Sequence, residues 1–253
     1  MDKKLYLSYK NNQELFKQHS KSYYLGSMLF SFEKFKHICT FYGLFRYVKD
    51  IVDANNIPIK EKKHKLNDIK KLFFFLYNIS KCNLEKVNWD KYPIIFYSVF
   101  YTIHTLEIPK ELFVRFFKSM EMDLEKFKYE TYDHLLDYMD GSAAIVGEVM
   151  LYIMKCDSNY YDQKIDSFIR FAQSLGVAFQ LTNFIRDINE DISMDPSRIY
   201  MPQNELEQFN INLNEYKLTK KIDHKFIEFI EFQINKNKEI YKFSQIGIDN
   251  LNV

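Results

Sequence analysis

Apolar residues recur at helical spacing along nearly the whole chain. In the stretch FIRFAQSLGVAFQLTNFI they return every three or four positions, which places them along one side of a helix. The pattern predicts helices at about residues 12–20, 32–55, 61–79, 91–105, 110–127, 131–155, 163–193 and 222–245. We therefore expect an all-α protein. Because no Gly-, Pro- or Ser-rich linker divides the 253 residues, we expect one domain over residues 1–253.

The most informative polar positions interrupt the apolar run of residues 176–202. Asp187 and Asp191 stand four residues apart. Asn183 lies four residues before Asp187, and Gln180 lies three before that. At 3.6 residues per turn, these groups fall within about a third of a helix's circumference. One face thus carries two carboxylates and two amides, and because like charges on adjacent turns repel, we expect a positive partner between them.

An all-oxygen set of this kind suits a hard cation such as Mg²⁺, which keeps several waters and is completed by substrate phosphates. Arg186 and Arg198 lie close by in the sequence, as phosphate partners would. A solvated helix face with Arg–Asp pairs is the simpler explanation of a bare DxxxD spacing. The apolar flanks, however, predict a helix that is buried on most sides, and buried carboxylates without a partner are rare.

Four segments together resemble the motifs of the squalene/phytoene synthase family, the enzymes that join two prenyl diphosphates head to head. QLTNFIRDINED followed by RIYMP is similar to the family's second aspartate-rich motif. The other three are HSKSYY at residues 19–24, which resembles its N-terminal diphosphate-contacting stretch, YGLFRYVKDIVD at 42–53, which resembles its first aspartate-rich motif, and YMDGSAAIVGEVM at 138–150, which resembles its small-residue helix. The YMDGSAA spelling looks like the phytoene synthase branch.

The resemblance implies a single-domain helical bundle of the isoprenoid-synthase type around a central cavity, acting as a Mg²⁺-dependent prenyltransferase. Two prenyl diphosphates would condense C1 to C1′ through a cyclopropyl diphosphate intermediate. The favoured reaction is geranylgeranyl diphosphate to phytoene. Squalene or dehydrosqualene formation from farnesyl diphosphate is an alternative, and NADPH would serve only a squalene product. The alternative from another class is a catalytically inactive family member that acts as a lipid-binding or assembly factor.

The resemblance also assigns roles to individual residues. Mg²⁺, or Mn²⁺ in its place, would be held by Asp50, Asp53, Asn183, Asp187 and Asp191. The catalytic residues would be Tyr42, Arg46, Asp53, Asp187 and Asp191. The substrate diphosphates would contact His19, Ser20, Lys21, Ser22, Tyr42, Arg46, Gln180, Asn183, Arg186 and Arg198. A plain helix N-cap explains Ser20 and Ser22 equally well without the resemblance.

The first aspartate-rich stretch departs from the family pattern at Lys49. Relatives usually read DDxxD or DxxxD there, whereas this chain reads KDIVD, so a lysine occupies the first metal-ligand position. Either the ammonium serves as a phosphate partner, or the site has lost its ability to ionise one of the two substrates. The resemblance also predicts a chain that is short at its C-terminus, because relatives continue further beyond the position of Pro202.

Composition and charge limit the classes of partner that the protein is expected to bind. Lys+Arg 35 against Asp+Glu 34 gives a net charge of +1, so no overall field favours nucleic acid. The sequence lacks a signal-peptide core, and its three cysteines, without metal-ligand spacing, are typical of reduced, buried thiols. We expect a cytoplasmic monomer that binds prenyl diphosphates. Peripheral membrane contact is expected through the lysine-rich stretches 60–66 and 217–225, although a solvated loop is the simpler interpretation of each.

Overall fold

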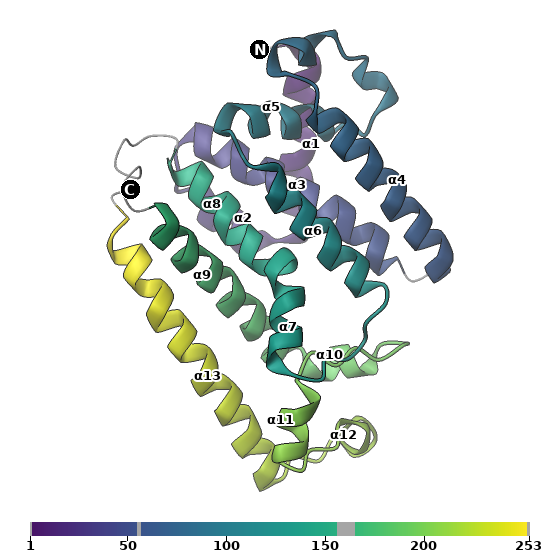
Figure 1. Ribbon diagram of the computed structural model, residues 1–253, viewed down its shortest axis with the longest axis vertical. Coiled ribbons are helices and arrows are strands. Elements are labelled where there is room, and N and C mark those ends of the chain that lie inside the picture. Colours follow the sequence, from purple (N-terminus) through teal and green to yellow (C-terminus); the bar gives the residue numbers. More distant parts are fainter. Residues whose placement is uncertain (1, 55–56, 156–164, 252–253) are drawn as a thin grey trace. The chain divides into compact units, whose positions relative to one another are not determined.

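Helices provide the regular structure of the computed structural model, which describes residues 2–54, 57–155 and 165–251 (Figure 1). These residues contain no strand, only an isolated bridge between Lys128 and Ile199. The helices are α1 Lys3–His19, α2 Lys21–Ser27, α3 Phe32–Asp53, α4 Ile59–Tyr77, α5 Phe96–Leu106, α6 Lys110–Asp123, α7 Tyr132–Met139, α8 Ile145–Lys155, α9 Ile165–Arg186, α10 Ile188–Ser193, α11 Gln203–Gln208, α12 Leu213–Thr219 and α13 His224–Asp249. The predicted all-α class is confirmed.

Most predicted helices are found, and the differences have local causes. The first helix begins at Lys3 rather than near residue 12, because Asp2 caps it by accepting a hydrogen bond from the Lys4 N–H at 3.2 Å. Helix α5 begins at Phe96, whose N–H donates to the Pro93 carbonyl at 2.9 Å, whereas the sequence pattern predicts a start near residue 91. The pattern misses α2, α11 and α12, which are too short to show a helical period.

The chain forms two compact units. Unit 1 comprises residues 1–113 and 149–161, and unit 2 comprises residues 114–148 and 162–253.

None of the helices in the described residues is long and apolar enough to cross a membrane. Cys39 is buried but Cys82 is exposed, which corrects the expectation that all the cysteines are buried, and Cys156 lies outside the described residues.

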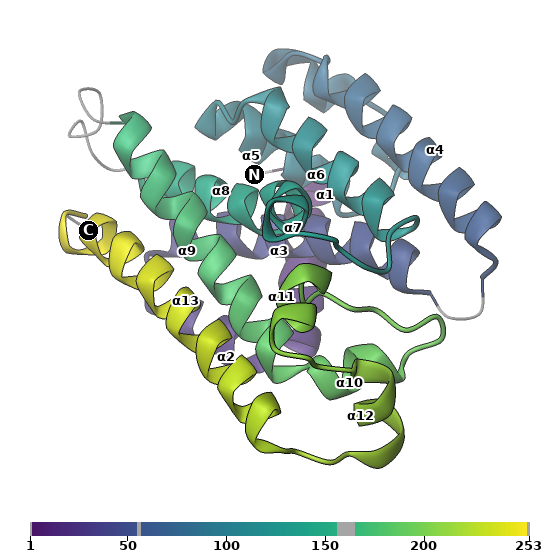
Figure 2. The same cartoon turned by 60° about the horizontal axis from the view of Figure 1, so that its bottom comes forward.

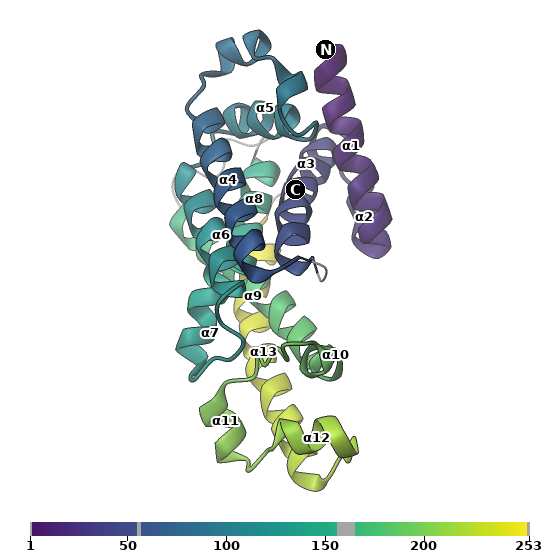
Figure 3. The same ribbon diagram turned by 90° about the vertical axis from the view of Figure 1, so that its right-hand side faces the viewer.

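In unit 1, α1 packs along α3 and α5 (Figure 3). A cluster of buried polar side chains lies between these helices. Ser8 Oγ donates to Ser98 Oγ at 2.9 Å. Asn12 Nδ2 donates to Ser98 Oγ at 2.9 Å and to the Ile95 carbonyl at 3.1 Å. A Cβ at Gly43 on α3 would meet Asn12 Oδ1 at 1.8 Å, so only glycine leaves room for this side chain. These polar contacts thereby fix the position of α1 against α3 and α5.

Aromatic rings fill the rest of the core of unit 1. Phe73 of α4 lies 5.0 Å from Phe100 and 4.9 Å from Phe113, measured between ring centroids. Trp89 stacks on Tyr97 at 4.6 Å. Rings at these separations add about 0.5–1.5 kcal/mol per pair beyond the area they bury. The many phenylalanines therefore hold α4 and α5 together.

In unit 2, three helical segments approach one another at glycines. A Cβ at Gly141 would meet the Arg115 carbonyl oxygen at 1.9 Å, and one at Gly147 would meet the Ala172 carbonyl oxygen at 1.9 Å. Gly176 lies similarly close to the Ala143 carbonyl, at 2.3 Å. These contacts are with backbone atoms, which cannot move aside as a flexible side chain can. The small residues around the π-helical turn at Asp140–Ala144 thus serve close helix packing.

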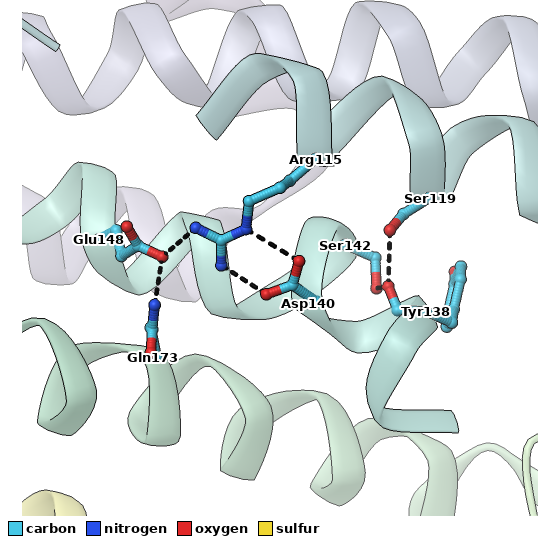
Figure 4. A network of polar contacts seen from close by, with 7 residues as sticks. All are labelled: Arg115, Ser119, Tyr138, Asp140, Ser142, Glu148 and Gln173. Carbon is cyan, nitrogen blue, oxygen red and sulfur yellow. Dashed lines mark hydrogen bonds and ion pairs between the residues drawn. The ribbon is translucent and has the colours of Figure 1, made fainter. Parts of the chain in front are cut away.

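An ion network ties the same segments together (Figure 4). Arg115 of α6 donates to both carboxylate oxygens of Asp140, at 2.8 and 2.5 Å, and to Glu148 Oε1 at 2.5 Å. Gln173 of α9 donates to the same Glu148 oxygen at 2.6 Å. The side chain of Arg115 is 19% exposed and that of Glu148 is 5% exposed. Because both charges are largely shielded from water, removing either one would leave the other buried without a partner and destabilise the fold.

Helix α13 lies alongside α9, also within unit 2 (Figures 1 and 2). Asn237 of α13 donates to the Ala178 carbonyl and to Thr182 Oγ1, each at 3.0 Å. A Cβ at Gly247 would meet Phe171 Cβ at 2.4 Å, so the two helices also approach closely near the end of α13. Helix α9 is therefore held along its length from two sides, by the glycine contacts and by α13.

Replacing Arg115 by Met should lower the free energy of unfolding by about 3–5 kcal/mol, because Glu148 would stay buried without its cation. Urea denaturation followed by circular dichroism measures this change. Lys242→Met is the matched control: its partner is Glu239, and the two side chains are 71% and 69% exposed, so its loss should cost about 1 kcal/mol or less. Equal losses in the two variants would contradict the buried role of Arg115.

His37 predicts a pH dependence of stability. Burial, with the nearby charge of Lys36, lowers the pKa of His37 from 6.5 to about 4, although Glu33 acts in the opposite direction. Its side chain is buried, and Nδ1 lies 3.0 Å from Thr102 Oγ1. The folded protein therefore keeps His37 neutral at pH values where the unfolded chain already binds a proton.

The free energy of unfolding should consequently hold steady above pH 6.5 and fall by about 3 kcal/mol as the pH drops towards 4. Urea titrations of the wild type and of His37→Gln across this range separate the His37 contribution from that of other groups. We expect a shallower decline in the variant. Parallel curves for the two proteins would rule out His37 as the cause.

Candidate functional site

Asp187 and Asp191 lie where α9 passes into α10. The Asp187 N–H donates to the Asn183 carbonyl at 2.8 Å, and the Asp191 N–H donates to the Asp187 carbonyl at 2.9 Å. Asp187 itself separates the two helices, with φ −97° and ψ 9°, but the four-residue hydrogen-bond spacing continues through it. The side chains of Asn183, Asp187 and Asp191 therefore occupy successive turns on one face, as their spacing predicts.

The positive partner that this face needs is Arg186. Its Nε and Nη2 atoms donate to the two carboxylate oxygens of Asp187, each at 2.6 Å. The Arg186 side chain is 67% exposed, whereas that of Asp187 is 27% exposed. An ion pair with so exposed a cation contributes little stability, about 0–1 kcal/mol. Arg186 is therefore able to exchange Asp187 for another anion at small cost.

Arg198 is placed differently, in the interior of unit 2. Its backbone N–H donates to the Asp191 carbonyl at 2.9 Å, and its Nη1 atom lies 3.7 Å from Asp123 Oδ1. The Asp123 side chain is 1% exposed and the Arg198 side chain is 15% exposed. Arg198 also donates to the Tyr200 hydroxyl at 3.4 Å. Its guanidinium thus joins a buried ion pair, and its contact with substrate stays a prediction.

A cluster of stacked aromatic rings surrounds that ion pair. Phe184 stacks on Tyr200 at 4.0 Å, and Tyr129 and Tyr138 lie 6.1 and 5.8 Å from the Tyr200 ring. Burial raises the pKa of Tyr129 and of Tyr138, so both stay protonated at neutral pH. Sequence analysis does not identify Asp123 as part of this cluster, because only folding brings it next to Arg198 and Tyr200.

The first aspartate-rich stretch forms the C-terminal end of α3, in unit 1. Arg46 Nε lies 2.8 Å from Asp50 Oδ1, an ion pair without the alignment of a hydrogen bond. Lys49 Nζ lies 3.4 Å from Asp53 Oδ1. The side chains in these pairs are between 30% and 45% exposed. Each carboxylate of this stretch is therefore matched by a cation one turn earlier on its own helix.

Tyr42 and Ser20 meet beside this stretch. The Ser20 side chain lies close enough to the Tyr42 phenol to lower its pKa, and the Tyr42 ring stacks on Phe16 at 4.1 Å. Burial raises the pKa of Tyr42 above its usual value of 10, with Arg46 lowering it and Asp50 raising it. Ser20 occupies the N-cap position of α2 but makes no side-chain capping bond, so capping does not explain its hydroxyl.

The remaining predicted site residues are less constrained. Gln180 and Asn183 are half-buried. The side chains on and beside α2 are exposed, namely those of His19, Lys21 and Ser22. The structure thus brings together Ser20, Tyr42, Arg46 and Asp50 within unit 1, and Asn183, Arg186, Asp187 and Asp191 within unit 2.

The two groups differ in how well they fit Mg²⁺. Asn183, Asp187 and Asp191 offer only oxygen ligands, which is the set that a hard cation prefers. The first stretch presents the fixed charges of Arg46 and Lys49 instead. Within the described residues, no three Asp, Glu, His or Cys side chains gather into a metal-binding group. The donor chemistry therefore favours a cation at the second stretch, completed by ligands from outside it.

Sequence comparison places these motifs among known proteins. The family model for squalene/phytoene synthase matches residues 16–252. Chloroplastic phytoene synthase of Oncidium hybrid cultivar is 25% identical over 249 residues, covering 94% of this chain and 54% of that protein. Phytoene synthase of Arthrospira platensis is 26% identical over 255 residues, covering 95% of this chain and 75% of that protein. The chain spans just over half the length of the chloroplastic phytoene synthases of Oncidium, Daucus carota and Narcissus pseudonarcissus.

Solved structures show the same fold. Squalene synthase HpnC from Alicyclobacillus acidocaldarius superposes with a TM-score of 0.78 at 20% identity, covering 99% of this chain and 87% of that one. A dehydrosqualene synthase in complex with a ligand gives 0.75 at 19% identity, covering 95% and 76%. Identities this low establish the fold alone. Since the family model matches nearly all of the sequence, however, we conclude that this chain belongs to the squalene/phytoene synthase family.

Proposed function

We propose that the chain is a Mg²⁺-dependent prenyltransferase that condenses two prenyl diphosphates head to head, converting geranylgeranyl diphosphate to phytoene. The observation that carries the proposal is the face where Asn183, Asp187 and Asp191 stand on successive turns of α9 and α10. Phytoene synthases among the relatives support this choice of substrate and product. Farnesyl diphosphate remains the alternative substrate, with squalene or dehydrosqualene as product and NADPH needed only for squalene.

In this proposal Asn183, Asp187 and Asp191 hold Mg²⁺, which when bound neutralises charge on a diphosphate leaving group. Arg186 then turns from Asp187 to a phosphate oxygen, to which its planar guanidinium donates two hydrogen bonds. The exchange is feasible because the Arg186 side chain is mostly exposed. The second stretch thereby contributes both the metal ligands and one cation to diphosphate binding.

The first stretch contributes fixed positive charge and hydroxyl donors. Arg46 and Lys49 present a guanidinium and an ammonium near the end of α3, and both groups bind phosphate. Tyr42 is protonated at neutral pH, as a phenol with the usual pKa of 10 is, and burial raises its pKa further, so its hydroxyl can donate to a phosphate oxygen. The metal-ligand role that the family resemblance gives Asp50 and Asp53 stays a prediction. Their ion pairs favour direct phosphate contact by Arg46 and Lys49 instead.

One observation favours a second candidate function. Lys49 already neutralises Asp53, at 3.4 Å. A catalytically inactive family member, acting as a lipid-binding or assembly factor, would need no metal at that position and would tolerate the lysine.

Incubation of the purified protein with Mg²⁺ and labelled geranylgeranyl or farnesyl diphosphate, with and without NADPH, separates these candidates after lipid extraction. We expect a C40 hydrocarbon from geranylgeranyl diphosphate without NADPH. A C30 product alone would change the assigned substrate. No product from either substrate, with none restored by Lys49→Asp, would leave the inactive family member as the better explanation.

Asp187→Asn and Asp191→Asn should each lower kcat/KM by about a hundredfold or more, because each removes a charge that acts on the leaving group. Glu190→Gln is the matched control, since Glu190 is an exposed acidic residue on the same short helix. It should leave kcat/KM within about twofold, because a surface charge outside the ligand face has little effect on the barrier. A comparable loss in Glu190→Gln would show that net charge, not ligation, matters.

A further inference from the structure

Large apolar side chains project from α2, from the turn that follows it and from the first residue of α3. Tyr23, Leu25, Met28, Leu29 and Phe32 are 59%, 65%, 56%, 89% and 74% exposed. We call these five side chains the α2 patch. They fall within ten consecutive residues, so they form one small region and are not scattered over the surface. Exposed apolar groups gathered in this way mark interaction sites on soluble proteins.

The α2 patch is held outward by what lies beneath it. Tyr24 and Ser27, on the opposite side of α2, are buried. The Tyr24 ring meets Phe16 edge-on at 5.5 Å and Phe35 at 5.6 Å, and its hydroxyl accepts a hydrogen bond from Gln13 at 2.9 Å. Because Tyr24 anchors α2 on α1 and α3, the patch residues cannot turn into the core without breaking these contacts.

Positive charge accompanies the α2 patch. Lys17 and Lys21 are the lysines that most closely precede the patch in the sequence, and both are exposed. The nearest acidic residues in the sequence, Glu14 and Glu33, are paired with Lys10 and Lys36. Lys17 lies in the last turn of α1, just before α2, and is exposed. An excess of lysines attracts anionic lipid head groups, each lysine near the surface strengthening binding about fivefold.

The lysine-rich stretch 60–66, for which the sequence offers either membrane contact or a solvated loop, lacks this combination. Lys65 pairs with Glu61 at 2.9 Å, and Lys62 donates to the Val52 carbonyl at 2.9 Å. The apolar residue within the stretch, Leu66, is 1% exposed. That stretch therefore offers nothing to insert into a bilayer.

We propose that the α2 patch docks the protein on the surface of an anionic lipid bilayer. The exposed apolar side chains enter the boundary between head groups and acyl chains, while Lys17 and Lys21 face the anionic head groups. The predicted diphosphate-contacting residues His19–Ser22 run directly into the patch. A prenyl diphosphate with its tail in the bilayer would meet them there, and this delivery role, unlike the docking itself, rests on the proposed function.

Sedimentation of the full chain with vesicles tests the docking without any substrate. We expect binding to vesicles of phosphatidylcholine mixed with phosphatidylglycerol, and binding that weakens as salt is raised, because salt screens the lysines. Leu29→Ser combined with Phe32→Ser should weaken it at least tenfold, because two inserted side chains lose their apolar environment. Lys17→Glu should weaken binding to the anionic vesicles about fivefold or more and leave binding to pure phosphatidylcholine unchanged.

The matched control removes two other exposed apolar residues, Leu218→Ser combined with Ile222→Ser, from the lysine-rich stretch 217–225. Leu218 is 86% exposed and Ile222 is 60% exposed. This control should keep wild-type vesicle binding. Equal weakening in both double variants, or none in either, would overturn the proposal. So would an α2-patch variant that changes only the oligomeric state in light scattering, because a second copy of the chain would then be what covers the patch.

Turnover of detergent-dispersed prenyl diphosphate, measured in parallel, keeps this proposal separate from the proposed function. The Leu29→Ser and Phe32→Ser variant should retain that turnover, since neither residue belongs to the assigned site. Vesicle binding without turnover in the wild type would contradict the enzyme proposal and leave the docking intact. Turnover without vesicle binding in the wild type would contradict the docking alone.

Discussion

Carboxylates on adjacent helical turns need a compensating positive charge, and both aspartate-rich stretches are arranged around that constraint. At the end of α3, Arg46 and Lys49 each stand one turn before the carboxylate that they neutralise. Where α9 meets α10, the compensation comes from Arg186, whose side chain is much more exposed. This difference affects the chemistry of the two stretches. Asp187 becomes available to a metal when Arg186 moves away, whereas Arg46 and Lys49 stay near their carboxylates at the end of α3 and can contact phosphate from there.

The packing of unit 2 gives the second stretch a stiff support. Helix α9 touches its neighbours closely at Gly176, and Gln173 joins it to the ion network centred on Arg115. From the other side, Asn237 of α13 binds the backbone and side chain of its middle turns. Because α9 is fixed by these contacts, they also set the position of Asp187, which directly follows the last residue of α9.

Periodicity and spacing predict the all-α class, most helices, and the shared face of Asn183, Asp187 and Asp191, because all of these are properties of a single helix. The contacts that depend on folding are not predictable in this way. The pairing of Asp123 with Arg198 and the joining of Arg115 to Asp140 link segments that lie far apart in the sequence, and no spacing encodes them. Ser20 shows a subtler limit: its residue type favours a helix cap, but its side chain makes no capping hydrogen bond and lies near the Tyr42 phenol instead.

The central claim is that the second stretch holds the metal while the first supplies fixed cations, and a count of bound ions tests it most directly. Electron paramagnetic resonance gives the number of Mn²⁺ ions bound per chain in the presence of geranylgeranyl thiodiphosphate, an unreactive substrate analogue. Asp191→Asn should lower that number, whereas Asp50→Asn should leave it unchanged. Loss of Mn²⁺ in Asp50→Asn with full binding in Asp191→Asn would contradict the assignment of the metal to α9 and α10.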